Sequence, residues 1–455
     1  MEKSYYTPVK HSFRSAASWS NRLIWALPVI TVIVFLPTFF NGFQLGWDDT
    51  WQVLRNPLVQ DASWENIVFH FTHFWERQYS PVNSLFYAAV ADPFGFNATA
   101  FHTACLFVHL CSTFLVYGVI RQVLDKLLPQ TEISKSHIYA LFTALVFAIH
   151  PLQVESVAWI SASKILLYAF FTLLALWCYI RYVQSSHLLW LIATAFAYAL
   201  GFASKEQAII LPLNLLLVDY ALGRFSLLTW KRILLSRGIL EKIPFFLLAI
   251  AFWYFSWVND TGSITQAGGY PFHQRLFFTM YSLTEYIFRF LAPVKLYFFH
   301  PFPVSPGESL PLYYWGYIPL VGIIGYYVWD HYRKGNRLVV VGFLFFLVNL
   351  LLVLHIIPLP RTVITADRYM YLSTAGLALI LVWQMDQWLS RQPRSYKASL
   401  IMGSMIWFLF LGTHTYVRTM DWKDSETAKA SVNDLIEKKQ KAREIESSFN
   451  LIENE

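Results

Sequence analysis

Two adjacent carboxylates, Asp48 and Asp49, stand in the segment GWDDTWQVLRNP, a few residues beyond the first long apolar run of the sequence. Neighbouring carboxylates raise one another's pKa, so one of them can serve as a general base, and the pair can also bind a divalent cation. An Asp that precedes a helix can instead cap its free backbone N–H groups. The residue types therefore leave a catalytic and a structural role open.

Other ionisable side chains gather in short connections between apolar runs. They are His150, Glu155, Lys205, Glu285, Arg289, Arg361, Asp367, Arg368 and, beside them, Tyr371. A charged side chain at a membrane edge is costly to insert and needs a partner or a wet cavity, so each of them is a candidate functional residue. A salt bridge at the interface explains Lys205 and Glu206 equally well.

The elements that must position these side chains are transmembrane helices. Of the 455 residues, 56% are apolar and only 14% charged, against about 25% charged in an average soluble domain. An aromatic content of 18% fits helices whose ends lie in membrane interfaces. The basic residues are dispersed and form no nucleic-acid-binding motif, so nucleic acid is excluded as a partner. The three cysteines lie inside apolar runs, which predicts neither a disulfide framework nor a cysteine metal site.

Eleven apolar runs approach the length that crosses a membrane, about 20 residues. They lie near residues 23–40, 97–120, 138–150, 165–180, 187–203, 207–221, 243–258, 313–329, 338–357, 374–389 and 398–416. Lys and Arg favour the cytoplasmic side, and most of them fall in loops that share a side with the N-terminus. This distribution predicts a cytoplasmic N-terminus, and an odd number of spans places the C-terminal tail outside.

We therefore predict an all-α polytopic membrane protein with about 11 transmembrane helices. Residues 1–22 form the cytoplasmic N-terminus, residues 23–416 the transmembrane domain, and residues 417–455 an outward-facing, helical, charged tail. The first and fourth outer loops, about 41–96 and 259–312, are rich in Trp, Tyr, Phe and Pro. We expect amphipathic helices in both loops that lie on the membrane surface.

Several stretches resemble membrane-embedded glycosyltransferases of the GT-C type that use lipid-phosphate sugars. The closest resemblance is to the transmembrane and tetratricopeptide-repeat O-mannosyltransferases and their bacterial relatives. HPLQVESVAWI and ADRYMYL are the most specific stretches, and GWDDTWQVLRNP, SKEQAIILPLNLLLVDY, YIFRFLAPVKLYFFHPFP and THTYVRTMDWKDS also match. In order, the matching stretches cover most of residues 41–425.

The resemblance implies a GT-C-like bundle and an inverting transfer from a polyprenyl-phosphate sugar to a hydroxyl. It places the catalytic base in the acidic pair, with Asp48 ranked before Asp49. Lys205, Arg368 and Arg361 are then candidates for binding the donor phosphate, so no metal is required, although a divalent cation at the acidic pair stays open. The residues expected to shape the cavity are His150, Glu155, Asp367, Tyr371, Glu285 and Arg289.

The sequence departs from the family pattern in three places. Ser80 stands where eukaryotic members carry Arg, and Ile165 stands where Asp usually follows Lys164. The expected tetratricopeptide repeats are not visible in the roughly 39 residues after Tyr416, barely one repeat of about 34 residues. We therefore expect the acceptor to be presented by a separate protein, or to be a small molecule or lipid. The same departure favours a bacterial inner membrane over the endoplasmic reticulum.

Together these features predict a glycosyltransferase that moves a hexose from polyprenyl phosphate to a hydroxyl on protein or glycan at the outer or luminal face. The resemblance implies mannose as the sugar. A transporter or flippase of a lipid-linked or small anionic substrate is the alternative, but it is expected to place coupling charges near mid-membrane, often in paired repeats of broken helices. A non-catalytic scaffold that binds partners through its tail is a third possibility.

Overall fold

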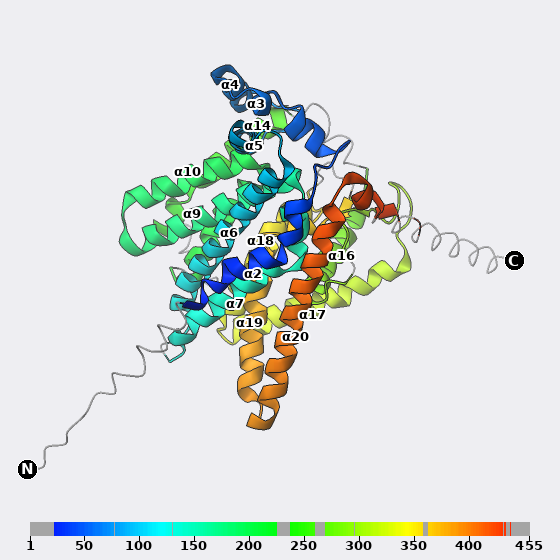
Figure 1. Ribbon diagram of the computed structural model, residues 1–455. Helices are drawn as coiled ribbons and strands as arrows, with labels where there is room; N and C mark the ends of the chain where they lie inside the picture. Colours follow the sequence, from blue (N-terminus) through cyan, green and yellow to red (C-terminus); the bar gives the residue numbers. More distant parts are fainter. Residues whose placement is uncertain are drawn as a thin grey trace, which may run out of the picture.

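The computed structural model describes residues 22–430 except 77, 130, 225–236, 260–268, 295 and 358–362, together with residues 432, 433 and 437. The described chain is mostly helical (Figure 1). Its helices are α2 (Ala26–Val34), α3 (Pro57–Gln60), α4 (Trp64–Thr72), α5 (Pro81–Phe94), α6 (Ala98–Leu127), α7 (Ser136–Ile149), α8 (Val154–Ala158), α9 (Ser163–Ser185), α10 (Leu188–Ser204), α11 (Leu211–Ala221), α13 (Arg237–Leu240), α14 (Ile243–Asn259), α16 (Phe272–Leu291), α17 (Tyr317–Arg333), α18 (Arg337–Leu350), α19 (Thr374–Arg391) and α20 (Arg394–Thr419).

Helices α6, α7 and α9 form the centre of the bundle. α9 packs along α6 and α10, and α7 packs between α6 and α19. α7 is hydrophobic on nearly every side, and Ala144, Phe147 and Ala148 are fully buried in it. A helix that is apolar all round belongs in the interior, where each face meets another helix. These helices therefore form the scaffold that carries the loops at their ends.

Two glycines allow α18 and α19 to cross in backbone contact. A Cβ on Gly342 would lie 2.8 Å from the carbonyl oxygen of Gly376, and a Cβ on Gly376 would lie 2.9 Å from the backbone nitrogen of Phe346. Both distances are shorter than carbon atoms tolerate, and the atoms they meet belong to rigid helix backbone. The close crossing thus depends on the absence of a side chain at both positions.

The outward faces of several helices are apolar. In α20, Met402, Met405 and Leu409 are 60–70% exposed, and α17 buries none of its residues. Figure 1 shows α19 and α20 as a hairpin that projects from the bundle, at the end opposite α3 and α4. Exposed apolar surface on this scale is unfavourable in water, whereas lipid covers it at no such cost. The chain is therefore a helical membrane protein.

The number of spans expected from the sequence is too high. Within the described ranges, four helical stretches are long and apolar enough to cross a membrane, and they are Ala98–Leu127, Ile160–Ser185, Gly238–Val258 and Arg394–Trp422. A fifth exists if Ser136–Ile149 and Pro151–Ala158, which are bent by 54° relative to each other, form one broken span. The structure thus supports four or five spans on these criteria, and not about 11.

The difference arises because several apolar runs do not form one continuous helix. The run near 23–40 contains only the nine residues of α2, after which Pro37 lies in a short 3-10 helix, η1 (Leu36–Phe40). The run near 338–357 changes from α18 to a 3-10 turn at Leu351. Hydropathy averages do not detect such breaks.

Both long outer loops contain helices and converge on the same region. α3, α4 and α5 lie in the first loop, and α16 lies in the other. After α16, strand β1 (His300–Pro301) pairs antiparallel with β2 (Val363–Thr365), with His300 opposite Thr365. The strand pair holds the segment that follows α16 beside the 3-10 helix η9 (Asp367–Met370).

The chain after α20 returns to the first outer loop. Gly42 N–H donates to the Lys423 carbonyl (2.8 Å), the Gln44 amide donates to the Trp422 carbonyl (2.8 Å), and Ser425 Oγ donates to the Leu45 carbonyl (2.8 Å). Trp422 is only 2% exposed. The first part of the segment predicted as a tail is therefore packed against the first outer loop, which carries Asp48 and Asp49. Residues 438–455 lie outside the described chain.

Candidate active site

The acidic pair lies where the first outer loop enters a π-helical turn, η2 (Thr50–Leu54). Gly46 adopts a φ of +75°, which glycine tolerates without strain, and its N–H donates to Thr50 Oγ1 (2.8 Å). Consecutive residues in a helical turn point roughly 100° apart, because one turn takes 3.6 residues. Asp48 and Asp49 are therefore directed into different surroundings.

Asp49 is fully buried and holds the loop in place. Its carboxylate accepts hydrogen bonds from the backbone N–H of Gln44 (2.8 Å), from the backbone N–H of Ser161 (2.9 Å) and from the Ser161 hydroxyl. Burial raises the pKa of Asp49 to about 6, although these hydrogen bonds favour the ionised form. All of its described contacts are internal, so Asp49 fastens the first outer loop to the segment before α9.

Asp48 faces a cavity of about 330 Å³. The residues that line it are Trp47, Asp48, Trp159, Phe298, Phe299, Val363 and Arg368. The Asp48 carboxylate accepts hydrogen bonds from Trp51 Nε1 (3.3 Å) and Gln52 Nε2 (3.1 Å). Aromatic walls with a few polar groups are typical of small-molecule sites. The geometry gives Asp48, rather than Asp49, access to a substrate.

Arg368 faces the same cavity and is fixed from behind by Glu155. The Glu155 carboxylate is fully buried, accepts the backbone N–H of Arg368 (2.7 Å) and forms an ion pair with its guanidinium. The guanidinium also lies over the rings of Trp159 (5.7 Å) and Tyr369 (5.0 Å). The Arg368 side chain remains 22% exposed, so it can meet a further anion in the cavity.

Two lysines add positive charge near this pair. Lys164, in the first turn of α9, donates from Nζ to Gln78 Oε1 (2.8 Å). Its ammonium interacts electrostatically with Asp48 and Arg368, and also with Lys205. Lys205 follows the last residue of α10, where its backbone N–H donates to the Gly201 carbonyl (3.0 Å). Arg368 thus lines the cavity that Asp48 faces, whereas the two lysines lie outside its lining.

A second charged network lies behind η9 and does not line the cavity. Asp367 is fully buried between Arg418 (3.1 Å) and Arg289 (4.0 Å). Arg289 also pairs with Glu285 (3.5 Å) and donates to Thr365 Oγ1 (3.0 Å). Burial raises the pKa of Asp367 to about 6, and the neighbouring guanidinium groups oppose that rise. The network joins α16, α20 and β2, and thereby fixes the backbone that carries Arg368.

The remaining predicted site residues lie apart from the cavity lining. His150 is fully buried, its Nε2 lies 2.9 Å from the Phe290 carbonyl, and its ring stacks on the Phe290 ring. The Tyr371 hydroxyl lies 2.8 Å from His109 Nδ1, inside the helix bundle. These contacts support the packing of α7, α16 and α19. Arg361 lies outside the described residues.

Tryptophans from distant parts of the chain meet beside the acidic pair, and sequence reasoning missed them. Trp159 and Trp422 stack with ring centroids 5.3 Å apart, and Trp47 meets Phe298 at 5.1 Å. The sequence signal for them was their position inside the stretches GWDDTW, ESVAWI and TMDWKD. Lys164 was likewise missed as a site residue, although it shares a connection with Glu155.

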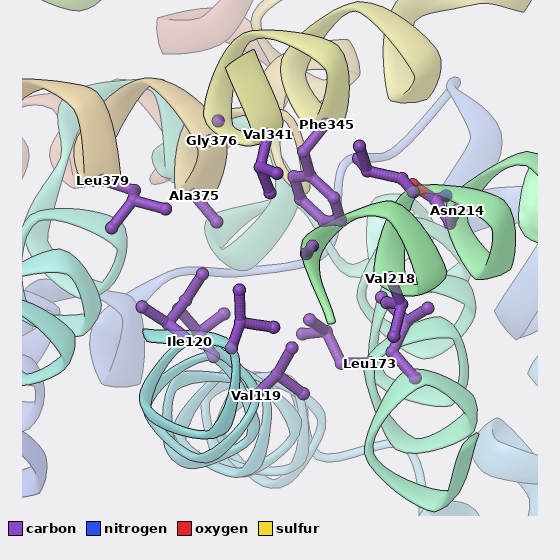
Figure 2. A pocket seen from close by; sticks show the side chains of 16 residues that line it. Val119, Ile120, Leu173, Asn214, Val218, Val341, Phe345, Ala375, Gly376 and Leu379 are labelled. Carbon is purple, nitrogen blue, oxygen red and sulfur yellow. The ribbon is translucent and has the colours of Figure 1, made fainter. Parts of the chain in front are cut away.

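A second, smaller cavity lies inside the bundle. It measures about 40 Å³ and is enclosed by α6, α9, α11, α18 and α19 (Figure 2). Its lining is apolar except for Asn214, whose amide pairs reciprocally with Asn349 (3.0 and 3.2 Å). No ionisable side chain lines it, so the cavity beside Asp48 is the better candidate for chemistry.

The sequence comparison finds a partial similarity to a human protein. The chain is 28% identical over 228 residues to the human protein O-mannosyl-transferase TMTC4. This match covers 45% of the chain and 30% of the human protein, so the chain corresponds to less than a third of that relative's length. No protein-family model matches the chain.

Metal ligands are sparse in the described part of the chain. No group of three or more His, Cys, Asp or Glu side chains lies close enough there to hold a metal ion. Asp48 and Asp49, which were considered for a divalent cation, take their hydrogen bonds from different donors on different sides of the loop. The cavity combines one accessible carboxylate, Asp48, with the guanidinium of Arg368, a set suited to proton transfer beside a phosphate.

Proposed function

We propose that the chain is an inverting glycosyltransferase that transfers a hexose, mannose in the first instance, from polyprenyl phosphate to a hydroxyl acceptor on protein or glycan. The acceptor oxygen attacks the anomeric carbon, and the bond from that carbon to the phosphate oxygen breaks. Asp48 takes the hydroxyl proton, and polyprenyl phosphate leaves with the bonding electron pair. A general base of this kind contributes about 10²–10⁴-fold to a rate.

The observation that carries this proposal is the shared cavity of Asp48 and Arg368. Asp48 can take the proton of the attacking hydroxyl, and Arg368, which faces the same cavity, can stabilise the leaving phosphate. The partial similarity to a human O-mannosyl-transferase supports the same reaction class. Conversely, a transporter has no need of an accessible carboxylate beside cations in one cavity at the membrane edge.

The phosphate would be bound by Arg368 together with Lys164 and Lys205. Arg368 is held rigidly by Glu155, and a preorganised donor stabilises developing charge without rearrangement. Lys164 interacts electrostatically with Arg368 and with Lys205, and both lysines would add positive charge when protonated. These three cations neutralise the leaving phosphate, so the proposed mechanism requires no divalent metal.

The proposal includes a GT-C-like arrangement in the membrane. Shorter apolar helices, such as Leu188–Ser204 and Arg337–Val353, would lie within the bilayer beside the longer spans. The site would then open on the face opposite the basic loops, where lipid-linked donors are presented. A bacterial inner membrane is the location we propose.

The direct test is transfer of labelled hexose by the full chain in proteoliposomes, with polyprenyl-phosphate mannose or glucose as donor and a Ser/Thr-rich peptide as acceptor. We expect transfer that persists in EDTA and falls at least about 100-fold in Arg368→Gln, because one strong phosphate contact is lost. Arg391→Gln, an exposed arginine at the end of α19, is the matched control. Absence of transfer from every donor contradicts the proposal, and loss of transfer in EDTA contradicts its metal independence.

A further inference from the structure

The cavity beside Asp48 offers far more aromatic surface than the phosphate chemistry requires. Its walls include the rings of Trp47, Trp159, Phe298 and Phe299. A lipid phosphate needs cations, and a polyprenyl chain needs an apolar groove that leads into the membrane. A compact aromatic wall beside the base is instead suited to the sugar ring, which is attached to the phosphate on the side opposite the polyprenyl chain.

Trp47 presents an indole that no parallel ring covers within the described chain. Its ring meets Trp159 at 77° and Trp422 at 86°, and it is tilted by 52° to Phe298. Trp47 is only partly buried and directly precedes Asp48. The face of an indole is electron-rich, and the C–H bonds on one side of a pyranose carry partial positive charge, so the two surfaces attract each other.

Trp159 supplies an independent observation that points to a ligand. Its indole N–H is buried, and no hydrogen-bond acceptor lies within reach in the described part of the chain. Buried indole N–H groups usually have a partner. The ring itself is immobilised, since it stacks on Trp422 and carries the Arg368 guanidinium above it at 5.7 Å. A hydroxyl oxygen of a bound sugar is an acceptor of the required kind.

We propose that Trp47 and Trp159 form the sugar subsite of the cavity. The C–H face of the hexose packs on the Trp47 indole, and a sugar hydroxyl accepts the hydrogen bond of Trp159 Nε1. This inference rests on the proposed function and adds which walls bind the sugar rather than the phosphate. Positive charge develops on the sugar ring during transfer, and the Trp47 face stabilises that charge as it does any cation.

The test separates sugar binding from phosphate binding with two probes, labelled polyprenyl-phosphate hexose and the same lipid phosphate without sugar. In Trp47→Ala we expect the KM for the donor to rise about tenfold, the factor that corresponds to one aromatic contact. The sugar-free lipid phosphate should inhibit this variant to within about twofold of its effect on the unmodified chain. Loss of a contact to the phosphate would instead weaken inhibition about tenfold. Trp47→Phe, which keeps a ring, should recover part of the loss.

Trp159→Phe and a control complete the design. Trp159→Phe removes the N–H but keeps an aromatic ring, and it should also raise the donor KM without weakening inhibition by the sugar-free lipid. Trp64→Ala, a 75% exposed tryptophan in α4, should change neither quantity. Thermal unfolding in detergent verifies that each variant is folded before kinetics are compared.

The outcomes are distinguishable. An unchanged donor KM in Trp47→Ala and Trp159→Phe contradicts the sugar subsite but leaves the proposed function standing. A parallel weakening of inhibition by the sugar-free lipid also contradicts it, because the tryptophans then act on the phosphate or on the fold. If the unmodified chain transfers no hexose and binds neither lipid, the proposed function fails, and this is seen before any variant is made.

Discussion

At the scale of single residues, Asp48 and Asp49 differ in burial and therefore in role. Asp48 faces the cavity, and its described hydrogen bonds come from two side chains. Asp49 is enclosed and accepts two backbone N–H groups and a hydroxyl. A buried carboxylate with three hydrogen-bond donors holds the loop in place, and its loss should displace Asp48, which faces the cavity.

The raised pKa of Asp49 predicts a specific pH dependence of stability. Because its folded-state pKa, about 6, exceeds the unfolded value of 3.8, the folded protein binds the proton more tightly between these values, and stability falls as pH rises through this range. The full difference is on the order of 3 kcal/mol. Relative to Asp49→Asn, the unmodified chain should therefore become less stable from pH 4 to pH 7.

Thermal unfolding of both proteins in detergent across this pH range measures the effect. Asp367, whose pKa burial also raises to about 6, is present in both proteins, so its contribution cancels in the difference. A stability difference that does not change with pH would show that Asp49 has an ordinary pKa.

At the scale of elements, the backbones of α18 and α19 lie in direct contact where the two helices cross. α18 and α19 meet at Gly342 and Gly376, and α19 in turn packs on α7. α19 begins just after η9, which carries Arg368. The crossing therefore sets where the 3-10 helix, and with it the guanidinium, is held relative to the loop of Asp48.

Gly376→Ala should destabilise the fold by about 1–3 kcal/mol, because the new methyl group meets backbone atoms of α18 that cannot rotate away. The matched control is Gly403→Ala in α20, where no atom lies within 4 Å of the added Cβ. That change should stabilise its helix by up to about 1 kcal/mol. The two melting temperatures, measured in the same detergent, should move in opposite directions; equal shifts would show that the crossing is not close.

The segment after α20 is the element that the sequence described least well. The sequence predicts a charged tail over residues 417–455, yet Trp422 is buried and stacks on Trp159, which lines the cavity. The hydrogen bonds from this segment to the first outer loop join residues about 380 positions apart in the chain, and no local pattern encodes such a pairing. The same reason explains why the tryptophan cluster was missed, since hydropathy does not distinguish a ring at the membrane interface from one in a site.

At the scale of the whole molecule, the exposed apolar faces of the helices identify a membrane protein. The sequence could predict the helical membrane class, because apolar runs are visible in the composition of each segment. Isolated charges likewise single out the acidic pair and Arg368, whose roles stay a prediction. It could not predict the number of spans, because breaks such as the one at Pro37 depend on local backbone geometry. Nor could it show that Glu155 and Arg368 are partners, since they are 213 residues apart.

The distribution of basic residues predicts that α4 and the turn between α19 and α20 lie on opposite sides of the membrane. Single cysteines at the exposed positions Glu65→Cys and Ser395→Cys test this arrangement in a chain whose three native cysteines are replaced by Ala. An impermeant maleimide added from outside should label only the cysteine at position 65. Labelling of both positions, or of position 395 alone, would contradict the orientation.

The measurement that tests the central claim most directly is donor binding and hexose transfer by Asp48→Asn in proteoliposomes. The substitution keeps the size of the side chain and removes the base, so we predict donor binding close to that of the unmodified chain and a transfer rate lower by about 10²–10⁴-fold. Glu65→Gln, an exposed carboxylate in the same outer loop, should transfer at the normal rate. Normal transfer by Asp48→Asn would contradict the account.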